Sequence, residues 1–254
     1  MTDITAPNPY AAPTSELQNV ADAANVPTIE QALSRGYDFS ITDLLGEAWR
    51  RTKGTKGLII GGFLVFYAAM FVATLVLNLI LGVFGALTGG GVGLMVVSSI
   101  VSMLATVLAY PFLAGINMIG IRKAADQPLQ FSEIFSHFDR TVPVVITALL
   151  MSALSLIGYL LFVLPGIYLS IAYLLAIPLV VERGLSPWQA MEASRKAITQ
   201  HWFKAFGLFL LIGILLMLSA IPLGIGLVWT LPMMIVAIGV LYRTIFGVRP
   251  VPSN

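Results

Sequence analysis

Long apolar stretches alternate with short charged segments along this chain. Three stretches contain no Asp, Glu, Lys, Arg or His, and they cover residues 57–121, 141–181 and 205–242. About 20 apolar residues are enough for a helix to span a bilayer. A helix as long as the second stretch would measure about 60 Å, whereas the hydrocarbon core is about 30 Å thick. The pattern therefore predicts that each stretch folds back on itself as a helical hairpin.

Turn-forming residues stand where these hairpins need them. They are residues 88–93, Pro165, Gly166, Pro222, Gly224 and Gly226. The predicted membrane spans are residues 58–84, 95–120, 143–164, 167–181, 205–222 and 227–243. We therefore expect an all-α polytopic membrane protein with about six transmembrane helices arranged as three hairpins.

An amphipathic stretch precedes each hairpin, with its apolar residues at helical spacing. The apolar faces consist of Ile41, Leu44, Leu45, Ala48 and Trp49, then Phe131, Ile134, Phe135 and Phe138, and finally Trp188, Met191, Ile198 and Trp202. Ser40, Ser132 and Ser186 are placed to act as helix N-caps. We expect three interfacial helices, because Trp and Phe favour the headgroup plane. The alternative is that these segments pack on the end of the helix bundle.

The two ends of the chain differ from the apolar middle. Residues 1–38 are rich in Ala, Pro, Asn and Thr, and such a segment buries too little apolar surface to offset its ordering entropy. We expect a disordered cytoplasmic tail there, a helical membrane domain over residues 39–248, and a short cytoplasmic tail over residues 249–254. We expect no signal peptide, because the first 56 residues lack the short apolar core behind a basic start.

Composition and charge placement strengthen the membrane assignment. Hydrophobic residues make up 58% of the chain and charged residues only 10%, against about 25% charged in a typical globular domain. Thirteen of the 14 Lys and Arg residues fall outside the predicted spans and Arg243 ends the last span, so that all 14 lie on one side of a six-span topology. The positive-inside rule then places both termini and every charged segment in the cytoplasm.

Ten cations near the predicted membrane boundary are candidates for contacts with phospholipid headgroups. They are Arg50, Arg51, Lys53, Lys56, Arg122, Lys123, Arg183, Arg195, Lys196 and Lys204. A cation beside an anionic leaflet contributes on the order of 1 kcal/mol to membrane binding. For Arg183 two interpretations stay open, either pairing with Glu182 at the cytoplasmic mouth or exposure at a helix end. Nucleic acid is not an expected partner, because the cations are dispersed among acids.

Five polar residues lie within the apolar stretches: Asn78, Asn117, Tyr110, Tyr159 and Tyr173. They could line a narrow polar path, although hydrogen bonding between helices is the commoner use of such residues. No Asp, Glu, His, Arg or Lys lies centrally in any predicted span, which argues against a proton-driven transporter.

No motif indicates catalysis or a cofactor. The chain has no cysteine, and its histidines, His137 and His201, stand in different segments without a partner at metal-ligand spacing. No G-x-S-x-G nucleophile motif occurs, and no glycine run carries the Lys-Ser/Thr pair of a phosphate-binding loop. We therefore expect no catalytic residues, no metal and no cofactor.

Two segments carry a family resemblance. They are residues 47–66 (EAWRRTKGTKGLIIGGFLVF) and residues 164–210, with Leu164, Pro165, Gly166 and Ile167 at a turn, then Pro178, Glu182, Gly184, Ala190 and Ser194. They resemble the YciC-type group of uncharacterised bacterial inner-membrane proteins and, more distantly, the membrane domain found with some glycerophosphodiester phosphodiesterases. The resemblance implies a helical inner-membrane protein of undefined activity. No hydrolase activity carries over, because the phosphodiesterase domain is absent from this chain.

These observations leave three functional hypotheses. The first is a non-enzymatic inner-membrane protein that organises or binds lipids or other membrane proteins. The second is a transporter or exporter component for an amphiphilic or peptide substrate, which needs a cavity lined by the polar residues. The third is a lipid-acting enzyme, which needs Glu182, Arg195 and His201 clustered in one pocket. The sequence leaves the oligomeric state open.

Overall fold

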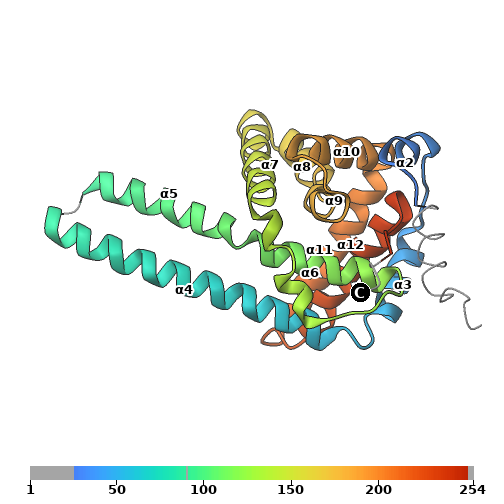
Figure 1. The fold of residues 1–254 in the computed structure, drawn as a ribbon, viewed down its shortest axis with the longest axis horizontal. Coiled ribbons are helices and arrows are strands. Elements are labelled where there is room, and N and C mark those ends of the chain that lie inside the picture. Colours follow the sequence, from blue (N-terminus) through green and yellow to red (C-terminus); the bar gives the residue numbers. More distant parts are fainter. Residues whose placement is uncertain (1–25, 90, 251–254) are drawn as a thin grey trace, which may run out of the picture.

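The computed structural model describes residues 26–89 and 91–250, and every regular element among them is a helix (Figure 1). In chain order these are α2 (Ile29–Arg35), α3 (Ile41–Arg51), α4 (Lys56–Thr88), α5 (Val92–Leu108), α6 (Tyr110–Ala124), the short 3₁₀ helices η1 (Phe131–Phe135) and η2 (Phe138–Arg140), α7 (Thr141–Leu161), α8 (Val163–Ala172), α9 (Ala176–Arg183), α10 (Pro187–Gln200), α11 (Trp202–Ala220) and α12 (Leu227–Phe246). The predicted all-α class is confirmed.

Each apolar stretch is broken close to the predicted turn. α4 ends at Gly89, which has the left-handed conformation that glycine adopts easily. The second break falls at Phe162, which is extended, so that Pro165 stands in the first turn of α8. Proline is tolerated there because a first-turn N–H has no partner within the helix. The break therefore comes three residues before the predicted one.

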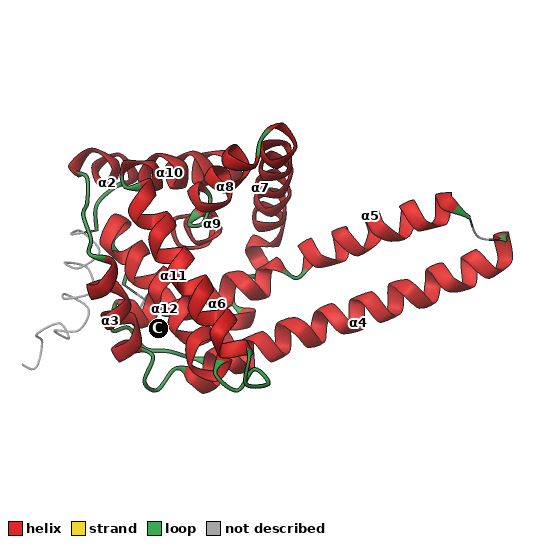
Figure 2. Ribbon diagram, turned by 180° about the vertical axis from the view of Figure 1, so that it is seen from behind, coloured by secondary structure: helices red, strands yellow, loops and turns green. Residues whose placement is uncertain are grey.

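Five helical segments are long and apolar enough to cross a membrane: Lys56–Leu87, Phe131–Leu161, Val163–Arg183, Trp202–Ala220 and Leu227–Phe246. They differ sharply in exposure. The most apolar window is 0% buried in the first of these segments but 67% buried in the last. Figures 1 and 2 show why, since α4 and α5 extend together away from the other helices whereas α12 lies among them. The turn between α7 and α8 points in another direction from that long pair.

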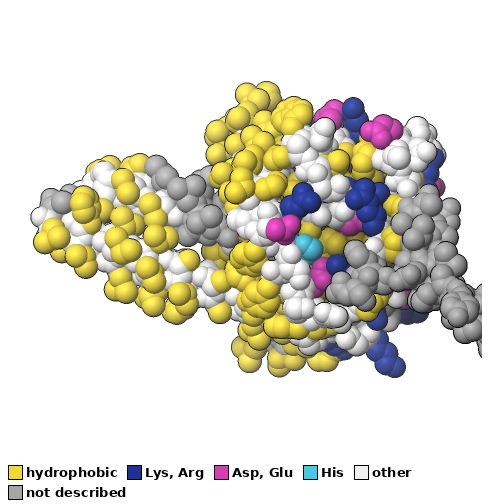
Figure 3. Space-filling model, viewed as in Figure 1, with side chains coloured by type: hydrophobic (Ala, Val, Ile, Leu, Met, Phe, Trp, Pro, Cys, Tyr) yellow, Lys and Arg dark blue, Asp and Glu magenta, His cyan; other side chains and the backbone are white. Residues whose placement is uncertain are grey.

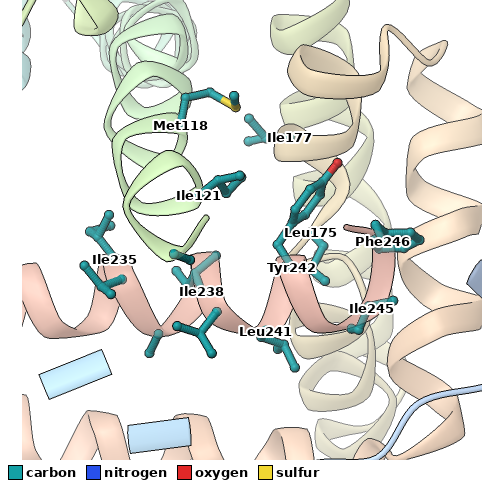
Figure 4. Close-up of a cluster of buried hydrophobic side chains, with 14 of the residues drawn as sticks. Met118, Ile121, Leu175, Ile177, Ile235, Ile238, Leu241, Tyr242, Ile245 and Phe246 are labelled. Carbon is teal, nitrogen blue, oxygen red and sulfur yellow. The ribbon is translucent and has the colours of Figure 1, made fainter. Parts of the chain in front are cut away.

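The core forms where α12 packs against α6 and α3. Figure 4 shows side chains of α12, α6 and the α8–α9 region meeting, with Ile121, Leu175 and Tyr242 among them. The two helices approach closely because Gly120 and Gly239 face each other, and a Cβ on Gly239 would collide with the Gly120 carbonyl oxygen. α12 suits this enclosed position, because a helix that is apolar on every side is buried by the protein around it.

The third hairpin departs from the predicted arrangement. Near the end of α12, Arg243 Nη2 donates to Glu47 Oε1 of α3 at 2.9 Å. Near its beginning, the Trp229 ring centroid lies 5.1 Å from Lys56 Nζ. Both ends of α12 therefore meet the same charged segment, and α12 runs alongside α3. The turn before α12 therefore lies near Lys56, whereas the predicted arrangement puts all three turns on the face opposite every charge.

Two of the three amphipathic segments form α-helices, and the middle one does not. α3 and α10 are α-helices, and they bury Leu44 and Ala48, or Met191 and Ile198, against the protein core. Their apolar faces thus follow the alternative of packing on the bundle. The middle segment forms only the 3₁₀ helices η1 and η2, where the predicted helix is wrong. A segment this short gains too few hydrogen bonds to nucleate an α-helix.

Part of the predicted tail is ordered. α2 begins with a capping box, in which Thr28 and Gln31 bond each other's backbone N–H groups. Arg35 then donates to the carbonyls of Thr244 and Ile245, and Tyr37 Oη donates to the Ala197 carbonyl at 3.2 Å. This part of the predicted tail is therefore helical and packed on the core, because Ala32 is buried there and Ile29 and Leu33 pack against the core beside these polar contacts. Residues 1–25 and 251–254 lie outside the described residues.

Candidate functional site

Charged side chains gather on the compact part of the molecule, while the long α4–α5 pair shows mostly hydrophobic surface (Figure 3). The ten candidate cations on this part fall into two groups. Six form ion pairs with acidic side chains: Arg51, Arg122, Arg183, Arg195, Lys196 and Lys204. For the other four no acidic partner occurs among the residues that the structure describes: Arg50, Lys53, Lys56 and Lys123.

The largest ion-pair network joins α3, α6 and α12. Arg51 contacts both Glu47 and Asp126 at 2.6 Å, and Arg243 contacts Glu47 from the other side at 2.9 Å. Burial raises the pKa of the Glu47 carboxyl, but the hydrogen bonds from Arg51 and Arg243 outweigh this, so the pKa lies below its ordinary value. The hydrogen bond from Arg51 likewise lowers the pKa of Asp126. The charge of Arg51 is therefore compensated by acidic side chains of the protein itself.

Arg183 holds the two described ends of the chain together. Its guanidinium donates to the carbonyl oxygens of Pro27, at 3.2 Å, and Phe246. Its Nε lies 2.6 Å from Glu182 Oε2 as an ion pair without hydrogen-bond geometry, and both side chains are 4% exposed. Glu182 also accepts from Tyr242 Oη at 2.7 Å. Of the two interpretations left open, pairing with Glu182 is confirmed.

The remaining paired cations also contact acidic side chains of the fold. Glu133, which is buried, forms an ion pair with Arg122 at 2.9 Å and lies 2.8 Å from His137 Nε2. Glu192 contacts Arg195 and Lys196 of its own helix. Lys204 pairs with Asp38, and the hydrogen bond from Lys204 lowers the pKa of that carboxyl. These cations stabilise contacts of the fold, which reduces their capacity to bind an external anion.

Three of the four unpaired cations share one pocket. Arg50, Lys53 and Lys56 line a cavity of about 410 Å³ together with Trp49, Thr52 and Trp229. The two tryptophans are half-exposed, and Lys56 Nζ lies over the ring of Trp229 at a distance typical of a cation–π contact. None of the described residues that line this cavity is acidic. We call it the basic pocket.

The basic pocket is formed by the turn between α3 and α4. Thr52 and Thr55 are buried and donate to the carbonyls of Ala48 and Thr52, which fixes the turn. Gly54 adopts a left-handed conformation, with φ of 85°, between them. The side chains on either side of this turn, Arg50 in the last turn of α3 and Lys56 at the first position of α4, consequently point into the same space.

The positive charge of Lys56 lies at the positive end of the α4 helix dipole. It stands at the first position of α4, where the helix dipole is positive, and Thr55 provides no side-chain cap there. Anions are favoured at uncapped helix N-termini. The lysine and the helix end therefore both favour a negatively charged ligand in the basic pocket.

The sequence pattern predicts the three cations of the basic pocket but not its second wall. Trp229 lies in a predicted span, 180 residues from Trp49, among residues that are apolar for many positions. No local signal distinguishes it from a lipid-facing or core tryptophan. Only the packing of α12 along α3 brings it to Lys56.

The five polar residues proposed for a path come from four parts of the fold. Asn78 is exposed on α4 and donates to its own helix at the Thr74 carbonyl, whereas Tyr173 is buried between α8 and α9. Tyr110 and Asn117 belong to α6, and Tyr159 of α7 contacts Ser170. No hydrogen bond or ring contact joins any two of the five in the described part of the chain.

The residues needed for a lipid-acting enzyme are also separate. Glu182 contacts Tyr242 and the Arg249 N–H, Arg195 pairs with Glu192, and His201 packs against Tyr37. Among the described residues, no group of three or more His, Cys, Asp and Glu side chains is placed to hold a metal ion.

No protein-family model matches the chain, and neither a curated protein nor a solved structure matches it. The resemblance to the YciC-type proteins therefore remains a prediction.

Proposed function

We propose that this chain is a non-enzymatic integral membrane protein that binds anionic lipids through the charged side of its helical core. The observation that carries this proposal is that its cations fall into two groups, one paired with acidic side chains and one without such ion pairs. Most are bound to acids of the fold, whereas Arg50, Lys53 and Lys56 are left together in one pocket. Such clusters at a membrane boundary are typical of anionic-headgroup binding.

Exposed apolar surface supports the membrane part of the proposal. Leu64, Phe71, Leu79 and Val83 of α4 are each more than half exposed, as are Leu160 and Leu161 at the end of α7. Burying such surface in lipid is favourable by about 25 cal/mol per Å². In our proposal α4–α5 and α7–α8 enter the hydrocarbon core of the bacterial inner membrane, as the YciC-type resemblance suggests, and the charged segments face the cytoplasm.

A lipid-preference measurement tests this proposal. The purified protein is placed in nanodiscs containing equal amounts of phosphatidylglycerol and phosphatidylcholine, and the lipid retained after detergent extraction is quantified. We expect phosphatidylglycerol to be enriched, and the enrichment to fall as salt increases, because screened charges attract less. Equal retention of the two lipids at low salt would contradict the proposal.

A further inference from the structure

The basic pocket has the size and charge of a site for a particular headgroup. Its volume of about 410 Å³ lies within the range of small-molecule sites, which is roughly 300–1,000 Å³. A single phosphate group would fill a small part of it. Trp49 and Trp229 add flat apolar walls, so the pocket differs from an open patch of lysines on a surface.

The number of positive charges in the basic pocket also favours a particular headgroup. Three cations line the pocket, and the positive end of α4 adds to them. A headgroup with one phosphate leaves at least two of these charges uncompensated. A headgroup with two phosphates compensates most of them, and basic pockets between membrane helices are known to suit such doubly charged lipids.

The position of the pocket favours a lipid over a free phosphate compound. Leu64, on the same helix as Lys56, is 66% exposed. Eight residues separate the two, which is about 12 Å along an α-helix. A lipid whose phosphate is held by Lys56 would therefore place its acyl chains along the apolar surface of α4.

Resting on the proposed function, we infer that the basic pocket binds the headgroup of a phospholipid that carries two phosphates. Arg50, Lys53 and Lys56 contact the phosphates, and Trp49 and Trp229 flank the glycerol portion. The acyl chains run along α4. The site thus selects one lipid class, where the proposed function alone requires only general attraction to anionic lipids.

Native mass spectrometry can test this selection. The delipidated full-length protein in detergent is titrated with diphosphatidylglycerol and, separately, with phosphatidylglycerol, the second at twice the molar concentration so that total charge is equal. We expect tighter binding of diphosphatidylglycerol. Lys53→Gln should weaken it about fivefold, the effect of one cation near an anionic lipid. Trp229→Leu should reduce the preference between the two lipids.

Lys123→Gln provides the matched control. Lys123 also forms no ion pair among the described residues, but it lies in the last turn of α6 near Asp126 and does not line the basic pocket. We expect this variant to weaken diphosphatidylglycerol binding less than Lys53→Gln does and to keep the preference between the two lipids. Melting temperatures in lipid-free detergent should agree among the variants, which shows that each has folded.

The outcomes separate the inference from the proposed function. If Lys53→Gln and Lys123→Gln weaken binding equally, or if both lipids bind equally at matched charge, the pocket inference is overturned while general anionic binding stands. If neither lipid binds, both fail. If soluble pyrophosphate displaces diphosphatidylglycerol at comparable concentration, the ligand is a free phosphate compound and the lipid inference is overturned.

Discussion

At the scale of single residues, two glycines determine how closely the central helices approach. Gly120 of α6 and Gly239 of α12 place backbone against backbone, and a Cβ on either would meet backbone atoms of the other helix. Backbone atoms cannot move aside as the end of a flexible side chain can. The sequence contains 23 glycines, and nothing local marks these two as contact positions.

We expect Gly239→Ala to destabilise the protein by about 3 kcal/mol, the upper end of the usual cost of overpacking. The added methyl group collides with the Gly120 carbonyl, so α6 and α12 must separate. Thermal unfolding in detergent micelles measures the effect. Gly82→Ala on α4 is the control, because its Cβ would meet nothing within 4 Å, and it should leave the melting temperature unchanged or slightly raised. Equal melting temperatures for the two variants would refute this account of the crossing.

At the scale of elements, one ion-pair network fastens α3 to α6 and α12. Glu47 is its centre, since it receives Arg51 from its own helix and Arg243 from α12. Arg51 extends the network to Asp126, just beyond the end of α6. The basic pocket depends on this arrangement, because the same attachment of α3 to α12 brings Trp49 and Trp229 into one cavity.

We expect stability to decrease in acid as this network is lost. The folded pKa values of Glu47 and Asp126 lie below those of the unfolded chain, which are about 4.3 and 3.9. Their contribution is therefore fully present above about pH 5 and is lost as the pH falls through the folded values. Since both groups are partly exposed, the total should be about 1 kcal/mol or less.

Melting temperatures between pH 7 and pH 3 measure this contribution. Glu47→Gln should have a lower melting temperature at pH 7 and a flatter pH dependence than the unmodified protein. Asp43→Asn removes an acid of the same helix that has no ion-pair partner among the described residues, and it should keep the original slope. An unchanged slope in Glu47→Gln would show that the network does not stabilise the fold.

At the scale of the whole molecule, polar contacts hold the two described ends of the chain together. Arg183 bonds the carbonyls of Pro27 and Phe246, and Arg35 bonds those of Thr244 and Ile245. The apolar α4–α5 pair extends away from this charged part. A membrane that receives the apolar pair should therefore leave both ends on one side.

Single-cysteine labelling tests that topology, because the chain has no cysteine of its own and each introduced thiol is the only one. We expect Ser34→Cys and Pro250→Cys to react only from the cytoplasmic side, and Val92→Cys, at the tip of the long pair, only from the opposite side. Leu223→Cys should not react from that opposite side, because the neighbouring Trp229 lies at Lys56. Labelling of the first two from different sides would overturn the topology.

The sequence determined the helix bounds only in part, because the predicted spans 95–120 and 167–181 are each divided, into α5 and α6 and into α8 and α9. The sequence alone determined the helical class and the presence of apolar helices long enough to cross a membrane. These follow from local properties, since a run without charges and with turn residues at its middle allows few other structures in lipid. Tertiary structure decided the rest. Burial could not be read from hydrophobicity, because α12 and α4 are both apolar yet one is enclosed by protein and the other is exposed. Ion pairing depends on residues far apart in the chain, so only the fold separated Arg51, which is used internally, from Arg50, Lys53 and Lys56, which share a pocket with Trp229.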